Sequence, residues 1–160
     1  MLLVAFSAGA FAQPATATAN ATATIVTPIA IAQVDDMSFG NIGTTGAVGT
    51  VSITTAGARA VTGGCYLPAV TGTFNAASFD VTGQANATYT IAINEVSITL
   101  SGPGADMTLD TWATDPTPTG TLSGTGTETI TVGATLHVGV GQLAGAYASG
   151  SPFSITVNYN

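Results

Sequence analysis

Apolar and polar residues alternate one by one along much of the chain. The final run, residues 153–159, has four apolar residues on one strand face: Phe153, Ile155, Val157 and Tyr159. Residues 15–24 (ATATANATAT) alternate in the same way near the start of the chain. Because alternate side chains of a β-strand point to opposite faces, each run offers one apolar ridge and one polar ridge. Both ends of the chain are therefore predicted to be able to form strands.

Similar runs recur between these ends, separated by turns rich in glycine and proline. Residues 48–56 alternate, with Val51 and Ile53 on the apolar face. The other predicted strands are residues 25–34, 60–70, 77–82, 89–94, 96–100, 107–112 and 129–140. Apart from the first residues and a possible short turn near residues 142–146, no segment has apolar residues at helical spacing. The pattern predicts roughly eight to ten strands.

This pattern favours an all-β fold. Short strands with regular turns are typical of two antiparallel sheets packed face to face, so an immunoglobulin-like or pilin-like β-sandwich is expected. A closed barrel is the main alternative. The longest polar stretch, residues 113–126, is expected to lie in a loop.

The N-terminus has the features of an export signal. Residues 1–11 are mostly apolar, and residues 10–12 form an A-x-A cleavage site. We therefore predict a signal peptide over residues 1–12, an Ala/Thr extension over residues 13–24 and a β-sandwich domain over residues 25–160. The predicted location is the bacterial cell surface or exterior, reached through the periplasm.

Charge changes the picture by excluding classes of partner. The chain has one Lys or Arg against eight Asp and Glu, which gives a formal net charge of -7. Nucleic acids and anionic membrane surfaces both require Lys and Arg for recognition, so neither is expected as a partner. The apolar leader is too short for a transmembrane helix, and no membrane span is expected in the mature chain.

No group of residues forms a recognisable catalytic or metal-binding motif. Asp35 and Asp36 fall in a predicted turn, and the other clustered acids do not have EF-hand spacing: Asp106, Asp110 and Asp115. His137 is the only histidine and is expected on an exposed strand face, while Cys65 has no partner for an intrachain disulfide. We predict no enzyme activity, no cofactor and no metal site. Trp112, beside the polar stretch, is a possible platform for a sugar ring.

Four short motifs resemble an uncharacterised family of exported bacterial β-sandwich proteins, known only as a domain of unknown function: FGNI at 39–42, VGATL at 132–136, GAY at 145–147 and VNY at 157–159. The Gly-x-Tyr motif before a strand ending in Tyr is also similar to spore-coat-U-type subunits of archaic chaperone–usher pili. In those subunits the spacing between the Gly-x-Tyr motif and the last strand is shorter, whereas in this chain residues 148–152 lie between them. This second resemblance implies an incomplete sandwich, completed by the N-terminal extension of a neighbouring subunit, and a periplasmic chaperone.

Two functions are therefore expected from different classes. The first is a structural subunit of a surface filament or coat, in which identical copies exchange strands. Its acceptor would be the groove beside Phe153, Ile155, Val157 and Tyr159, and its donor residues would be Ala15, Ala17, Ala19, Ala21, Ala23, Ile25, Ile29 and Ile31. The alternative is a monomeric secreted glycan-binding or adhesin module that uses loops around Trp112.

Overall fold

The computed structural model describes residues 14–160, and within them the chain forms thirteen β-strands and no helix. The predicted signal peptide lies outside the described residues. Within residues 14–160 there is no helix long and apolar enough to span a membrane. The strands are β1 (Ala30–Asp35), β2 (Ser38–Phe39), β3 (Gly43–Ile53), β4 (Arg59–Tyr66), β5 (Phe74–Asn75), β6 (Ala77–Thr82), β7 (Thr88–Ile93), β8 (Ile98–Ser101), β9 (Met107–Asp115), β10 (Thr119–Thr121), β11 (Thr127–Val138), β12 (Ala148–Ser149) and β13 (Ile155–Tyr159).

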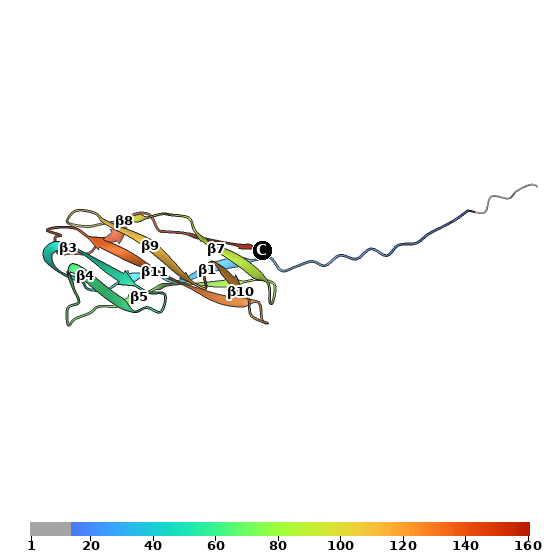
Figure 1. Cartoon of the computed structure of the whole chain (residues 1–160), viewed down its shortest axis with the longest axis horizontal. Helices are drawn as coiled ribbons and strands as arrows, with labels where there is room; N and C mark the ends of the chain where they lie inside the picture. Colours follow the sequence, from blue (N-terminus) through green and yellow to red (C-terminus); the bar gives the residue numbers. More distant parts are fainter. Residues whose placement is uncertain (1–13) are drawn as a thin grey trace, which may run out of the picture.

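The strands form one large antiparallel sheet and a smaller one that covers part of its inner face (Figure 1). The large sheet has the order β1-β6-β11-β9-β8-β12, and β3 and β4 continue from the second half of β11. The small sheet has the order β10-β7-β13, and β2 and β5 form a short separate pair. The all-β, sandwich-like prediction is confirmed. The large sheet curls into a half-barrel, however, and does not close into the alternative full barrel.

The long strand β11 carries the core from one end of the domain to the other. Its inward side chains are buried at every second position: Ile130, Val132, Ala134, Leu136 and Val138. The first two belong to a cluster covered by the small sheet, and the last three to a cluster between β3, β9 and the β2 region. Burying one face of a strand fixes its register, because a slip of one residue would turn every apolar side chain outward.

A β-bulge in β9 turns the only tryptophan into the core. Between two matched positions of the β9–β11 ladder, β9 carries one residue more than β11. Thr111, at this bulge, has a φ of 55°, which is rare for a β-branched residue. The extra residue shifts the alternation, so that both Leu109 and Trp112 face inward. Trp112 packs against both core clusters and joins them.

Arg59, the only basic residue, holds the β2 region onto β4. Its Nη1 donates hydrogen bonds to the carbonyl of Phe39 and, at 2.9 Å, to that of Asn41. The guanidinium carbon also lies 4.4 Å from the centre of the Phe74 ring, a cation–π contact. Among the described residues, 14–160, no carboxylate pairs with Arg59. Its charge instead satisfies main-chain carbonyls, which are strong acceptors for a charged donor.

Gly40, in the FGNI motif, lies inside this cluster and explains part of the motif. Its φ is +65°, and a Cβ at this position would lie 2.5 Å from the carbonyl oxygen of Thr71. Only glycine fits both the backbone conformation and the close approach. Local packing thus explains the glycine of the motif.

Most strand positions agree with the sequence prediction, and the differences have local causes. The predicted loop at residues 113–126 contains the end of β9 and the short β10. The strand count exceeds the prediction because β2, β5, β10 and β12 have only two or three residues each. Such short segments carry too little alternation to be recognised in sequence.

We predict that Arg59→Ala lowers the free energy of unfolding by about 2 kcal/mol, since charged hydrogen bonds to main-chain carbonyls are lost. Arg59→Lys is the control, because it keeps the charge and a donor but lacks the planar group that lies over the Phe74 ring. Arg59→Lys should lower the free energy of unfolding by less than Arg59→Ala does. Urea unfolding followed by circular dichroism measures both, and an Ala variant as stable as the wild type would contradict the role given to Arg59.

Candidate functional site

The last strand, β13, has one hydrogen-bonded edge and one open edge. Asn94 N donates to Ser154 O, and Asn160 N donates to Thr88 O. In an antiparallel ladder the bonded residues alternate, so the even-numbered residues of β13 direct their main-chain groups toward β7. The odd-numbered residues direct theirs away from β7. No other strand within residues 14–160 pairs with β13.

The side chains that sequence analysis assigned to the acceptor all contribute to the core. Val157 is buried, and three others pack against the same cluster while partly exposed: Phe153, Ile155 and Tyr159. These are also the residues whose main-chain N–H and C=O groups face the open edge. An added strand would therefore lie beside side chains that already belong to the core.

A groove lies just before the start of β13, between Phe153 and β1, which is also paired on one side only. We refer to it as the seam groove. Its volume is about 370 Å³. Gln33 and Asp35 of β1 form one wall, and Ser149 and Phe153 form the other. Core side chains, including Phe79, form the floor. A gap beside an unpaired edge, above an apolar floor, can be filled by one further strand.

The seam groove continues into a wider hollow of about 810 Å³ beneath residues 142–147. Four residues line both spaces: Met37, Phe39, Leu100 and Tyr147. The floor of this terminal hollow includes Leu136 and Val138 of β11.

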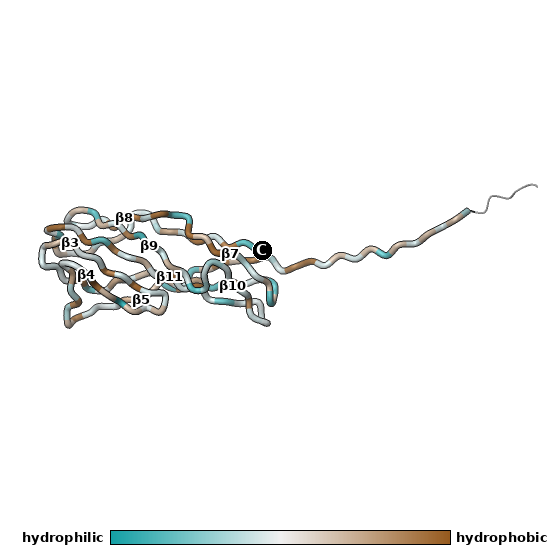
Figure 2. The backbone as a smooth tube through the Cα atoms, in the orientation of Figure 1, coloured by the Kyte–Doolittle hydropathy of each residue, from teal (hydrophilic) through white to brown (hydrophobic). Residues whose placement is uncertain are grey.

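The chain before β1 forms an extended arm, which we define as residues 14–28. Every residue of the arm is exposed, and the arm leaves the domain beside the C-terminus, along the long axis (Figure 1). Its first hydrogen bonds to the domain are made by Thr27. In Figure 2 a hydrophobic stretch, coloured brown, lies where the arm meets the domain. It contains Ile25, which is 97% exposed, and Val26.

The predicted donor residues fall into two groups. The smaller group consists of Ile29 and Ile31, which pack against the protein's own core. The larger group lies in the exposed arm: Ala15, Ala17, Ala19, Ala21, Ala23 and Ile25. Only this second group is free to meet another molecule without unfolding β1.

Tyr159 connects the base of the arm to the end of β13. Its hydroxyl donates to Thr27 O at 2.7 Å and accepts from Gln84 N at 2.6 Å. Thr27 N in turn donates to the Gln84 side-chain oxygen at 3.2 Å. These three bonds fix where the arm begins. They join β13 to the arm through a side chain and leave the main-chain edge of β13 open.

Glu95 anchors the other end of β13. Its carboxylate accepts hydrogen bonds from the N–H and the hydroxyl of Ser154, at 2.7 and 2.9 Å. These bonds hold the pKa of the Glu95 carboxyl below its ordinary value of 4.5. Asn94 adds a side-chain bond to the Ser154 hydroxyl at 2.9 Å. The strand is therefore fixed at both ends while one edge stays unpaired.

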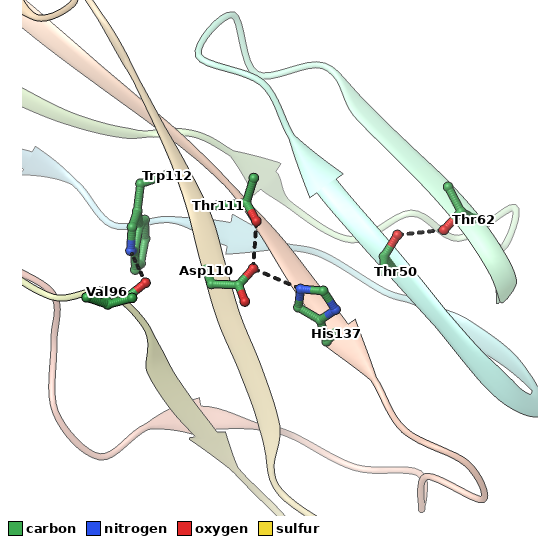
Figure 3. A network of polar contacts seen from close by, with 7 residues as sticks. All are labelled: Thr50, Thr62, Val96, Asp110, Thr111, Trp112 and His137. Carbon is green, nitrogen blue, oxygen red and sulfur yellow. Dashed lines mark hydrogen bonds and ion pairs between the residues drawn. The ribbon is translucent and has the colours of Figure 1, made fainter.

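Trp112, the possible sugar platform, is used in packing. Its ring centre lies 4.7 Å from that of Phe153, and its Nε1 donates to Val96 O at 3.1 Å (Figure 3). Phe153 also meets Phe79 edge to face, with centroids 6.1 Å apart. We refer to Phe79, Trp112 and Phe153 as the aromatic trio. It fills the interior beside the start of β13.

His137 and Asp110 form a polar pair on the outer face of the large sheet. His137 Nε2 lies 2.8 Å from Asp110 Oδ1, and Thr111 donates to the same oxygen (Figure 3). Bonds from Thr111 and His137 lower the pKa of the Asp110 carboxyl. A Thr50–Thr62 hydroxyl pair lies on the neighbouring strands. The predicted exposure of His137 is confirmed, since its side chain is 49% exposed.

The remaining chemical candidates are dispersed. Within residues 14–160, no three His, Cys, Asp or Glu side chains converge as metal ligands. Asp35 accepts a hydrogen bond from Ser78, and Cys65 is a buried free thiol whose pKa is raised by burial. The structure brings none of these groups together with the seam groove as a catalytic set.

The family model described as "Domain of unknown function (DUF4402)" matches residues 29–159. The chain belongs to the DUF4402 family. This confirms the uncharacterised-family part of the predicted resemblance. The likeness to spore-coat-U-type pilin subunits stays a prediction. No curated protein and no solved structure matches the chain. In this DUF4402 protein the matched region begins just after the arm and ends with β13.

Sequence analysis missed two parts of the site. β1 as the second wall could not be inferred, because alternation does not reveal which strand ends up at an edge. The hydroxyl bridge of Tyr159 was also missed, since it joins residues 132 positions apart. The sequence identified Tyr159 as part of an apolar ridge and of the VNY motif, without a role for its hydroxyl.

We predict that the anchoring of β13 weakens in acid. Because the folded-state pKa of Glu95 is lowered, its stabilising effect is present above pH 4.5 and lost as the pH falls through the lower folded value. Hydrogen exchange should show the protection of Thr156 and Asn158 amides falling as the pH drops from about 5 to about 3. Glu95→Gln should remove much of this pH dependence. An unchanged pH profile in that variant would contradict the prediction.

Proposed function

We propose that this DUF4402 protein is an exported, non-enzymatic structural subunit of a bacterial surface filament or coat. Copies would assemble by β-strand augmentation, with the arm of one copy added to the open edge of β13 in the next. The observation that carries the proposal is that an exposed, alternating arm and an unpaired edge strand occur in the same molecule. Main-chain hydrogen bonds along such an edge supply affinity, and alternate side chains supply specificity.

The length of the arm supports this assignment. Residues 15–25 span about 36 Å when extended, at about 3.3 Å per residue. The edge from Phe153 to Tyr159 spans about 23 Å on the same scale. The arm can therefore cover the whole edge and reach beyond it, while residues 26–28 connect it to its own domain.

The geometry also favours an open chain of subunits. The arm and the acceptor edge are different surfaces, so one copy's arm occupies another copy's groove in a head-to-tail contact. Contacts of this kind form rings if the rotation closes and filaments if it does not. The arm points along the long axis (Figure 1), which favours the filament.

Export and a chaperone fit the same proposal. Residues 1–12 have the pattern of a signal peptide, and the charge-poor surface has few trypsin-like cleavage sites, since the chain has one Lys or Arg. An open strand edge is prone to pairing with the wrong chain. A periplasmic chaperone that covers the edge before assembly would prevent this.

The alternative, a monomeric glycan-binding or adhesin module around Trp112, has less support. The Trp112 ring packs on Phe153, and its N–H is already bonded to a main-chain carbonyl. Glycan-array binding by a strictly monomeric wild-type protein would favour the alternative over a filament subunit.

We predict that deleting residues 13–24 leaves a folded monomer that cannot polymerise. The deleted residues that the structure describes, 14–24, are all exposed, so their loss should leave the thermal midpoint of the domain nearly unchanged. Size-exclusion chromatography and negative-stain electron microscopy measure assembly.

The matched control keeps the composition of residues 15–24 but breaks the alternation, for example by grouping the alanines before the threonines. It should also fail to assemble, because no face of the strand is then uniformly small. Filaments formed by the deletion variant would overturn the proposal.

A further inference from the structure

We infer that the acceptor selects a strand with small side chains and one large anchor. In this arrangement the odd-numbered alanines of the arm lie beside the inward-facing residues from Tyr159 to Phe153, with Ala21 beside the aromatic trio, and Ile25 fills the terminal hollow of the next copy. The inference rests on the proposed function, since it specifies how the same groove recognises the arm.

Direction follows from the shape of the molecule. β13 runs toward the end of the domain from which the arm leaves, because Tyr159 contacts Thr27 there. If the next copy follows by translation along the long axis, the arm enters its groove from the opposite end. Since the arm leaves beside the C-terminus and along the long axis (Figure 1), it then runs antiparallel to β13. This direction brings Ile25 toward the terminal hollow and Ala15 toward Tyr159.

Parity then decides which side chains face inward. The open edge of β13 offers the main-chain groups of its odd-numbered residues, whose side chains point into the core. Residues directly opposite in a ladder have side chains on the same face. A register that starts with Ala15 beside Tyr159 pairs odd residues with odd residues. The alanines and Ile25 therefore face the groove, and the threonines and Asn20 face outward.

The same register brings Ile25 beyond the start of β13. In this register Ala21 comes beside Phe153, and Ile25 extends past the bend at residues 150 and 151 toward Ser149, which lies in β12 and lines the seam groove. The terminal hollow adjoins this position through Tyr147. The one large side chain of the ridge thus reaches the one wide part of the acceptor.

Two features of the terminal hollow indicate a missing apolar and hydrogen-bonding neighbour. Leu143, which lines it, is 58% exposed, and Ile25 of the arm is 97% exposed. Gln142 Oε1, also in the lining, is buried without a hydrogen-bond partner. Native proteins satisfy most buried acceptors, and a strand entering here brings main-chain N–H groups.

The aromatic trio explains why the ridge carries an alanine, Ala21, at the position beside Phe153. Phe153 is in contact with both Trp112 and Phe79, so the interior beside it is already filled. A methyl group fits over such a floor, whereas a larger side chain forces the rings or the backbone to move. Small donor residues are thus suited to an acceptor that has kept its own aromatic core.

The first test compares Ile25→Ala with Val26→Ala in the full chain. Both residues are exposed in the monomer, so neither change should alter its thermal midpoint. Only Ile25 has the inward parity. We expect Ile25→Ala to raise the concentration needed for assembly about tenfold or more, and Val26→Ala to change it by less than about threefold. Equal effects of the two changes would overturn the inference.

The second test compares Ala21→Leu with Thr22→Leu, which add similar bulk to opposite faces of the arm. Ala21→Leu should block assembly, and Thr22→Leu should permit it. If Ala21→Leu strengthened assembly, the groove would be deeper than we infer, and the inference would be overturned while the proposed function stood. If the wild type does not assemble, or assembles without its arm, the proposed function and this inference both fail.

Discussion

Every strand in a sheet has two edges of main-chain hydrogen-bonding groups. The structure of this protein depends on strands that are hydrogen-bonded along one edge and unpaired along the other. β1 and β13 each have a single partner within residues 14–160, and the seam groove lies between β1 and Phe153, just before β13. Water can satisfy such edges in the single molecule. Another strand can satisfy them better, because it also covers the apolar floor.

An open half-barrel needs internal supports that a closed one would not. Trp112 joins the two core clusters, and it reaches the core only because the bulge at Thr111 shifts the alternation of β9. Arg59 ties the β2 region to β4 through main-chain carbonyls. These contacts hold the curved sheet in shape while the seam groove stays unfilled.

The scarcity of charge is compatible with this design. Hydroxyl groups take the outward positions that charged residues occupy in most proteins, as in the Thr50–Thr62 pair. A strand with threonines on its outer face and methyl groups on its inner face can be added to an edge without burying a charge, which would be costly. Alanine plugs contribute little apolar area each. An assembly of this kind would therefore rely on main-chain hydrogen bonds along the whole arm, with one larger anchor.

The sequence by itself determined the fold class, the faces of the main strands and the special character of both chain ends. Alternation is a local property, so Val51, Ile53 and the ridge from Phe153 to Tyr159 could be assigned inward positions correctly. Only the tertiary structure decided which strands lie at edges, that Ile29 and Ile31 stay in their own core, and that Trp112 is used in packing. Those outcomes depend on contacts between residues far apart in the chain and on a single extra residue in β9. Neither leaves a periodic signal in the sequence.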